Sequence, residues 1–174
     1  MFAERAATPG QVVFRNEPME LIQYAPQTGQ VHATPLLASP PWINKYHVMD
    51  LAPGRSFIEW VVTHERTVFA ISYRNPDPSM SGVTLDDYLI HGPRAALDVI
   101  GDITGAPAVD IVGLCLGGAL TGMLAAYLAK AGDARLGTVP LLNSLLDYSE
   151  PGCSARSPTS ARSPGWSGRL HGAA

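Results

Sequence analysis

Cysteine is scarce in this chain, and its scarcity limits the classes of protein that the sequence can encode. The 174 residues include two cysteines, Cys115 and Cys153. A small secreted domain held together by disulfide bonds contains more of them, so a disulfide framework is not expected. The cysteine content instead favours reduced, cytoplasmic conditions.

Excess charge and long apolar runs are missing as well. The net charge is −3, which gives no reason to expect binding to nucleic acid or to an anionic membrane surface. No apolar stretch reaches about 18 residues, and no basic segment followed by an apolar run opens the sequence. We therefore expect neither a membrane span nor a secretory signal. Hydrophobic residues make up 46% of the chain and charged residues 16%, as is typical of a globular domain with a core.

The most informative segment is residues 108–118, which read Ala-Val-Asp-Ile-Val-Gly-Leu-Cys-Leu-Gly-Gly. An apolar strand that enters a Gly-x-Cys-x-Gly turn and then an apolar helix is typical of a nucleophile elbow, with cysteine in place of serine. Gly113 and Gly117 stand two residues before and after Cys115, where a sharp turn crowds the two positions together. Gly118 gives the helix room to approach a neighbouring strand. The alternative is a buried structural cysteine in a glycine-rich turn.

In the elbow interpretation, Cys115 lies at the start of a helix over residues 116–131. Unpaired backbone N–H groups and the positive end of the helix dipole favour a thiolate there. The N–H of Leu116 points into the same space as the nucleophile, so we predict that it forms half of an oxyanion hole. The chemistry indicated is acyl transfer through a thioester on Cys115. The helical spacing of its apolar residues predicts that this helix is largely buried.

The remainder of the chain alternates between strand-like and helix-like segments. Two short strands are predicted within residues 12–25, and further strands at 34–39, 67–73, 108–113 and 137–146. Helices are predicted at 55–65 and 84–104, the second kinked or restarted at Gly92-Pro93. This alternation predicts an α/β fold with a mostly parallel sheet and helices on both faces. Sites in such sheets lie at the C-terminal ends of the strands, where the elbow and the loop 40–46 both fall.

Many segments of the chain share one family pattern: Thr8 to Glu17, Leu21 to Tyr24, Pro40 to Tyr46, Asp50-Leu51, Val68-Phe69, Arg74 to Asp77, Asp86 to Tyr88, Gly113 to Gly118, and Leu145 to Asp147. Through them, residues 2–152 resemble the class I polyhydroxyalkanoate synthases. The resemblance implies an α/β-hydrolase fold, truncated after about its sixth strand. It implies that residues 1–33 are a remnant of an N-terminal region with short strands, and that residues 34–152 are part of the catalytic domain.

Enzymes of this family polymerise (R)-3-hydroxyacyl-CoA into an intracellular polyester and release CoA. The resemblance therefore implies that Cys115 holds the growing chain as a thioester, with the CoA thioester as substrate and no cofactor. It also implies a homodimer at the surface of cytoplasmic polyester granules. The family's general-base histidine and its aspartate partner lie well downstream of the cysteine. We expect both positions to be absent from this chain, which would impair it as an enzyme.

Other residues of the chain are weaker candidates for a place in the site. The backbone N–H of Trp42 or Ile43, after the strand 34–39, is predicted to be the second oxyanion donor; a rigid loop that only shapes the rim is the alternative. A substitute base or acid is not expected, because catalysis needs placement within about an ångström. Surface or capping positions are favoured for His64 and His91, a strand-end or capping role for Asp147, and the tail for His171. His47 lies near the loop 40–46 and could approach Cys115, but it precedes the nucleophile and is not favoured as a base.

Residues 153–174 differ in composition from the rest, since Ser-Ala-Arg-Ser-Pro occurs twice, at 154–158 and 160–164. We expect a disordered tail there, interpreted as an out-of-frame ending, with a genuine low-complexity tail as the alternative. Three functions remain open on the sequence alone. The chain is an acyltransferase fragment that acts through Cys115, a non-catalytic product that associates with a full-length synthase or a granule, or a small thioesterase of the same fold.

Overall fold

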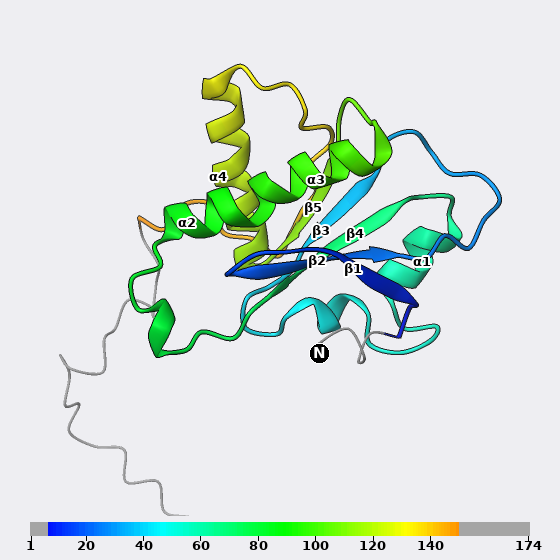
Figure 1. Cartoon of the computed structure of the whole chain (residues 1–174), viewed down its shortest axis with the longest axis horizontal. Helices are drawn as coiled ribbons and strands as arrows, with labels where there is room; N and C mark the ends of the chain where they lie inside the picture. The colour runs from blue at the N-terminus through cyan, green and yellow to red at the C-terminus, as the bar shows by residue number, and fades with distance from the viewer. Residues whose placement is uncertain (1–6, 150–174) are drawn as a thin grey trace, which may run out of the picture.

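A computed structural model describes residues 7–149 of the chain, and these form one mixed sheet with helices packed against it (Figure 1). The sheet has six strands in the order β1-β2-β4-β3-β5-β6. The strands are β1 Gly10–Arg15, β2 Met19–Tyr24, β3 Leu36–Ser39, β4 Val68–Tyr73, β5 Asp110–Leu114 and β6 Leu141–Leu142. The predicted tail, Cys153 and His171 lie outside the described residues.

The sheet is mostly parallel, as the sequence predicted. β3 pairs in parallel with β4 and β5, and β5 pairs in parallel with β6. β1 and β2 form an antiparallel pair at one edge, and β2 joins β4 in antiparallel orientation. Because β3, β4, β5 and β6 run the same way, their C-terminal ends meet at one edge of the sheet. Strands from both sides of residues 33 and 34 share this sheet, and the proposed domain division there stays a prediction.

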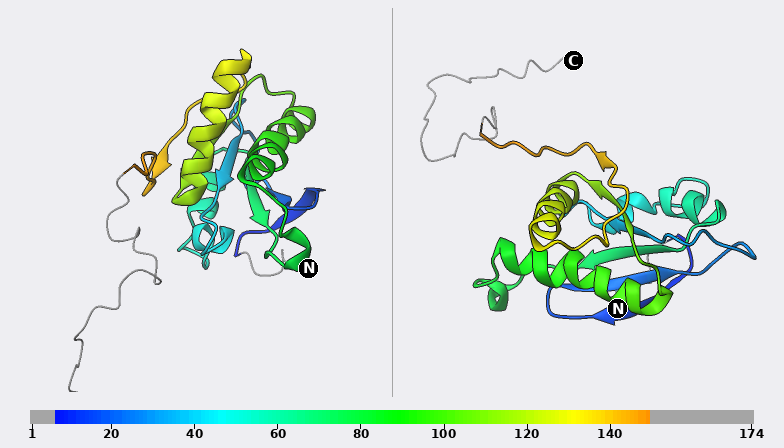
Figure 2. Two further views of the ribbon diagram at one scale, coloured as in Figure 1. Left: turned by 90° about the vertical axis from the view of Figure 1, so that its left-hand side faces the viewer. Right: turned by 90° about the horizontal axis from the view of Figure 1, so that it is seen from above.

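Helices cover both faces of the sheet (Figures 1 and 2). One face packs against α3, Ala95–Thr104, and α4, Leu116–Ala131, through a cluster that includes Leu37, Phe69 and Ile111. The other face packs against α1, Phe57–Thr63, and the 3₁₀ helix η2, Tyr46–Met49. The remaining helical elements are η3 Pro78–Met80, α2 Leu85–Leu89 and the π-helical η4 Ile90–Arg94.

The predicted boundaries hold closely for most elements, and α4 begins and ends where the sequence predicted. The break at Gly92-Pro93 is confirmed, since Gly92 has non-helical φ −95 and ψ −112 within η4. The predicted strand 137–146 is wrong in length, because the regular strand is only Leu141–Leu142 and Asn143 turns the chain with φ 47. The preceding residues still run along β5, since Thr138 O and Pro140 O accept from its backbone N–H groups. The expectation that α4 is largely buried is also wrong: Tyr127 is 43% exposed, because only one side of the helix contacts the sheet.

A buried carboxylate ties the start of the described chain to the segment between η2 and α1. Asp50 is fully buried and accepts hydrogen bonds from Thr8 N at 3.0 Å and Thr8 Oγ1 at 2.8 Å. Ser56 Oγ donates to the same carboxylate at 2.6 Å, and Ser56 also caps α1 by accepting from Glu59 N. Three donors therefore satisfy a group that would otherwise be costly to bury.

Asp50→Ala tests this network. The change leaves the Thr8 and Ser56 donors buried without an acceptor, so we expect the free energy of unfolding to fall by about 3 kcal/mol. Asp102→Ala, at an exposed position of α3, should change it by less than about 0.5 kcal/mol. Urea unfolding followed by circular dichroism measures both. Equal, small effects of the two substitutions would show that the Asp50 network contributes nothing to stability.

Candidate active site

Cys115 occupies the single residue between β5 and α4, at the C-terminal edge of the parallel strands. Its backbone has φ 56 and ψ −124, a region that non-glycine residues rarely adopt. Its N–H donates to Leu142 O at 3.0 Å, and its carbonyl accepts from Gly118 N at 3.0 Å and Ala119 N at 3.2 Å. The strained residue is therefore held from both sides, and its half-buried side chain projects at the sheet edge.

The glycines around Cys115 are required by close backbone contacts. A Cβ on Gly113 would lie 2.5 Å from Gly118 Cα, and a Cβ on Gly118 would overlap the side chain of Ser144. A Cβ on Gly117 would overlap the carbonyl oxygens of Ser39 and Pro40, at the end of β3. We expected Gly113 and Gly117 to crowd each other. Instead Gly113 lies against Gly118, and Gly117 lies against the neighbouring strand.

Two buried hydroxyls share one carbonyl at the start of α4, and the Ser39 hydroxyl ties this carbonyl to the end of β3. Ser39 Oγ donates to Gly117 O at 3.0 Å, and Thr121 Oγ1 donates to the same carbonyl at 2.7 Å. Both side chains are fully buried. The sequence analysis missed these positioning residues. The only signal was a small polar residue within each of two otherwise apolar elements.

The start of α4 presents unused hydrogen-bond donors beside Cys115. Within the described part of the chain, the N–H groups of Leu116 and Gly117 form no backbone hydrogen bond, as is usual for the first turn of a helix. They lie at the positive end of the helix dipole. An anion on the Cys115 side of this helix start would find both donors free. Leu116 N–H, the predicted oxyanion donor, is therefore unengaged by any group in residues 7–149.

The loop after β3 runs beside the elbow, because Pro40 contacts Gly117. Pro40 and Pro41 have no N–H, so Trp42 and Ile43 carry the first free donors after the strand. The Trp42 ring packs on Tyr88 at a centroid distance of 4.8 Å and on Tyr73 at 5.9 Å, whereas Ile43 is 82% exposed. Burial raises the pKa of Tyr73. Neither tyrosine was assigned a place in the site from the sequence, although Tyr88 belongs to the family pattern.

The same loop ends at a second strained residue. Lys45 has φ 60 and ψ −179, a conformation otherwise almost restricted to glycine. Partial burial lowers the pKa of its ammonium group. Tyr46, which follows, is buried at the start of η2. The loop is therefore anchored by Trp42 at one end and Tyr46 at the other, with backbone strain between them.

The other histidines and Asp147 have local partners. His64 stacks on Trp60, and its Nδ1 lies 2.6 Å from Trp60 O. His91 lies in η4, where its carbonyl accepts from Asn16 Nδ2 at 2.7 Å. Asp147 is exposed and accepts from Ser149 N at 2.9 Å, which lowers the pKa of its carboxyl group. The contacts of His64 and Asp147, and the exposure of His91, favour capping and surface roles.

His47 follows the loop directly, in η2, and its ring lies 4.1 Å from that of Tyr46.

Within residues 7–149, no group of side chains is arranged to hold a metal ion. Over the same residues, no helix has the length and apolar character needed to cross a membrane.

Comparison with solved structures identifies the class of fold. A fungal esterase from Rhizomucor miehei superposes with a TM-score of 0.59 at 16% identity, covering 88% of this chain and 49% of the esterase. A second esterase, rPPE, superposes with a TM-score of 0.60 at 14% identity, covering 88% of this chain and 48% of its own. The sheet, the helices on both faces and the elbow define part of an α/β-hydrolase fold, which confirms the predicted fold class.

Comparison with curated sequences identifies the family. Residues 3–61 match the family described as the N-terminus of poly-beta-hydroxybutyrate polymerase (PhaC). The chain is 46% identical to the poly(3-hydroxyalkanoate) polymerase subunit PhaC of Cupriavidus necator over 147 residues, 84% of this chain and 25% of that protein. It is 44% identical to the Methylorubrum extorquens polymerase over 84% of this chain and 24% of that protein. The chain belongs to the poly(3-hydroxyalkanoate) polymerase family and spans about a quarter of the length of these relatives.

Gly113→Ala tests the elbow packing. The new methyl group would meet Gly118 Cα, which belongs to the backbone and cannot rotate away, so we expect the free energy of unfolding to fall by about 3 kcal/mol. Gly101→Ala, in open space on α3, should raise it by about 0.5 to 1 kcal/mol, because alanine favours helix. Urea unfolding measures the pair. A Gly113→Ala variant as stable as the parent chain would contradict the observed packing.

Proposed function

We propose that this chain carries the nucleophile of a poly(3-hydroxyalkanoate) polymerase and accepts a hydroxyacyl group on Cys115. One observation carries the proposal. Cys115 is held at φ 56 between a buried strand and the start of α4, beside the unengaged N–H of Leu116. That geometry suits a nucleophile that attacks a carbonyl and leaves an oxyanion next to the helix start. The substrate is (R)-3-hydroxyacyl-CoA, and no cofactor is required, because the CoA thioester is already activated.

The acylation step needs no reactant other than the CoA thioester. The Cys115 thiolate attacks the thioester carbonyl, and the negative charge moves to the carbonyl oxygen. Leu116 N–H donates to this oxyanion, and the N–H of Ile43 or Trp42 is the second donor. When the tetrahedral intermediate collapses, the bond from carbon to the CoA sulfur breaks, the bond to Sγ remains, and the CoA thiolate takes up a proton.

Chain growth places a further demand on the site. The 3-hydroxyl group of another hydroxyacyl unit must lose its proton to attack the acylated cysteine, and this requires a general base. The His64 ring is held against Trp60, with its Nδ1 2.6 Å from Trp60 O, and His91 is exposed in η4. We therefore propose acylation as the step that the described residues carry, with slow or no polymerisation by them alone. In a complete polymerase the reaction takes place in the cytoplasm at a polyester granule, in a homodimer.

An apolar groove favours a second function, association with another polymerase chain. Leu85 on α2, Met123 on α4, and Leu146 and Tyr148 after β6 line a cavity of about 410 Å³ and remain exposed. β6, one of the two edge strands of the sheet, borders the same region. Exposed apolar surface next to a strand edge is a common feature of interaction sites.

No feature of the described residues favours a thioesterase over an acyltransferase.

The proposal predicts a covalent adduct on Cys115. After incubation with (R)-3-hydroxybutyryl-CoA, tryptic peptide mass spectrometry should locate one hydroxybutyryl group on the peptide that contains Cys115. Cys115→Ala should show no adduct anywhere in the described chain. An unmodified Cys115 at saturating substrate, in folded protein, would contradict the proposed function. So would an adduct of equal yield on the Cys115→Ala variant.

The second oxyanion donor can be tested at Ile43, whose side chain is exposed and whose N–H is the group of interest. Ile43→Pro removes the N–H, so we expect the rate of Cys115 acylation to fall by about 10²-fold, the usual effect of losing one such donor. Ile43→Ala keeps the N–H and should acylate at the parent rate. Equal rates for the two variants, at matched thermal stability, would exclude Ile43 and direct attention to Trp42.

A further inference from the structure

Three aromatic rings from distant parts of the chain meet beside the loop that follows β3. They belong to Trp42 of this loop, Tyr73 at the end of β4 and Tyr88 of α2. The ring centroids of Trp42 and Tyr88 are 4.8 Å apart, and Tyr73 lies 5.9 Å from Trp42 and 5.8 Å from Tyr88. Aromatic rings attract one another at such separations. The three rings therefore join the loop, the sheet and α2 into one packed unit.

The Trp42 ring restrains the part of the loop that carries the second oxyanion donor. Of residues 42–44, Trp42 packs against the core, whereas Ile43 and Asn44 are exposed. Within the described residues, neither the N–H of Trp42 nor that of Ile43 donates a backbone hydrogen bond. The peptide group that joins Trp42 to Ile43 carries the Ile43 N–H. Its orientation therefore depends on how firmly the Trp42 ring is held.

Tyr88 makes the closer of the two ring contacts with Trp42. Tyr73 is buried in the sheet, whereas Tyr88 is half-buried and comes from α2, a helix of five residues. A helix this short is not stable without contacts to the rest of the protein. The place of Tyr88, and with it that of the Trp42 ring, therefore depends on what holds the two ends of α2.

A capping box closes the start of α2. Thr84 Oγ1 accepts from Asp87 N at 3.3 Å, and Asp87 Oδ2 accepts from Thr84 N at 2.8 Å. Such reciprocal bonds satisfy backbone donors that the first turn of a helix leaves without partners. Because Tyr88 follows Asp87 directly, the capping box fixes the backbone next to the ring. The helix also contacts α4, which begins beside Cys115.

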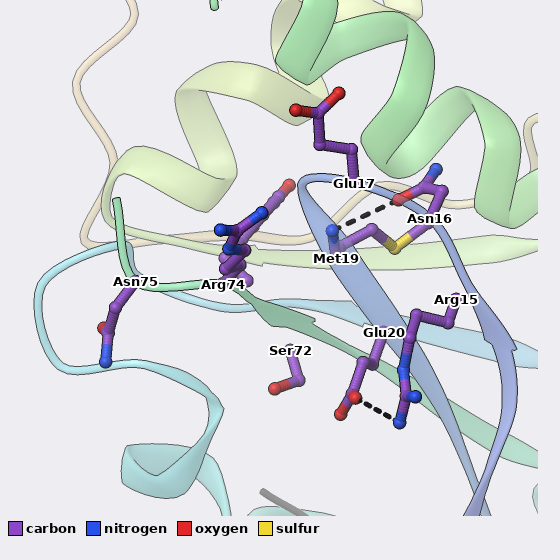
Figure 3. A pocket seen from close by; sticks show the side chains of 9 residues that line it. Arg15, Asn16, Glu17, Met19, Glu20, Ser72, Arg74 and Asn75 are labelled. Atoms are coloured by element: carbon purple, nitrogen blue, oxygen red, sulfur yellow. Dashed lines mark hydrogen bonds and ion pairs between the residues drawn. The ribbon is translucent and has the colours of Figure 1, made fainter. Parts of the chain in front are cut away.

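The turn between β1 and β2 holds the other end of α2. The helix continues into η4, where His91 O accepts from Asn16 Nδ2 at 2.7 Å. Asn16 is itself fixed, because its Oδ1 accepts from Met19 N at 3.1 Å (Figure 3). Gly92 leaves helical geometry at this point, and a Cβ on it would lie 3.1 Å from the Tyr73 hydroxyl oxygen. The helical run therefore breaks where it meets Tyr73, and Asn16 holds it there.

We propose that Tyr88 is a positioning residue for the acylation of Cys115. Its ring holds Trp42 so that the N–H of Ile43 or Trp42 stays available to the oxyanion, which Leu116 N–H also contacts. The Tyr88 hydroxyl takes no part, because ring packing makes the contact. The inference rests on the proposed function, since it names the residue that keeps the second oxyanion donor in place.

The test compares two reactions of Cys115 in the full chain. Acylation by (R)-3-hydroxybutyryl-CoA places a negative charge on a carbonyl oxygen and uses the oxyanion donors. Alkylation by iodoacetamide displaces iodide and forms no oxyanion, but it depends on the same thiolate. Mass spectrometry of the tryptic peptide that contains Cys115 measures both rates. The ratio of acylation to alkylation therefore reports the oxyanion donors and not the ionisation of the thiol.

Matched variants assign the effect to the Tyr88 ring. In Tyr88→Ala we expect the ratio to fall about tenfold, less than the effect of removing a donor outright, because a loosened donor still reaches the oxyanion part of the time. Tyr88→Phe keeps the ring and should keep the parent ratio. Tyr127→Ala removes an exposed tyrosine near the end of α4 and should leave the ratio unchanged. Tyr88→Leu keeps apolar bulk without a ring, so it should lower the ratio even if Tyr88→Ala does not fold.

The motion of the loop separates this inference from the proposed function. The NMR order parameter of the Ile43 amide should fall in Tyr88→Ala and Tyr88→Leu and stay at the parent value in Tyr88→Phe. An unchanged order parameter in the first two variants would overturn the positioning role whatever Cys115 does, and so would an unchanged ratio in a chain that acylates. If the parent chain forms no adduct with (R)-3-hydroxybutyryl-CoA, the acylation proposal fails, and the order parameter alone decides whether Tyr88 positions the loop.

Discussion

The close approach of α4 to the ends of β3 and β5 is the constraint on which the rest of the site depends. Gly117 contacts the backbone of Ser39 and Pro40, and Gly118 contacts Gly113, with no room for a Cβ at any of the three glycines. The chain must therefore pass from strand to helix within one residue. Cys115 takes up that turn with φ 56, so backbone packing places this half-buried residue at the sheet edge.

The elbow was predictable from sequence because its signals are local. Glycine spacing, an apolar strand and the long apolar run of α4 lie within residues 108–131, and the helix bounds came out as predicted. The Ser39 hydroxyl that holds the elbow was not predictable. Ser39 lies 78 residues before Gly117, and nothing near either residue indicates that they pair. The length of β6 was overestimated because Asn143 adopts a positive φ that a strand-like apolar run does not reveal.

The polar row of Arg15, Glu20 and Ser72 could not be predicted for a different reason. Glu20 alternates with Met19 and Leu21, both buried, which is the pattern of a strand with one face in water. Only the strand order β1-β2-β4, which is not the order in the chain, places Arg15, Glu20 and Ser72 side by side. The pairing of distant strands thus converts an ordinary surface pattern into a polar row with an unpaired carboxylate oxygen.

The central claim is that the strained cysteine reacts with an acyl thioester, and the amount of CoA released in the first turnover tests it most directly. Rapid-quench chromatography with (R)-3-hydroxybutyryl-CoA should give a burst of about one CoA per chain, followed by a slow phase, as expected for a covalent intermediate that forms faster than it is consumed. The burst should be absent from Cys115→Ala. A slow linear release of CoA without a burst, equal in the parent chain and in Cys115→Ala, would contradict the account.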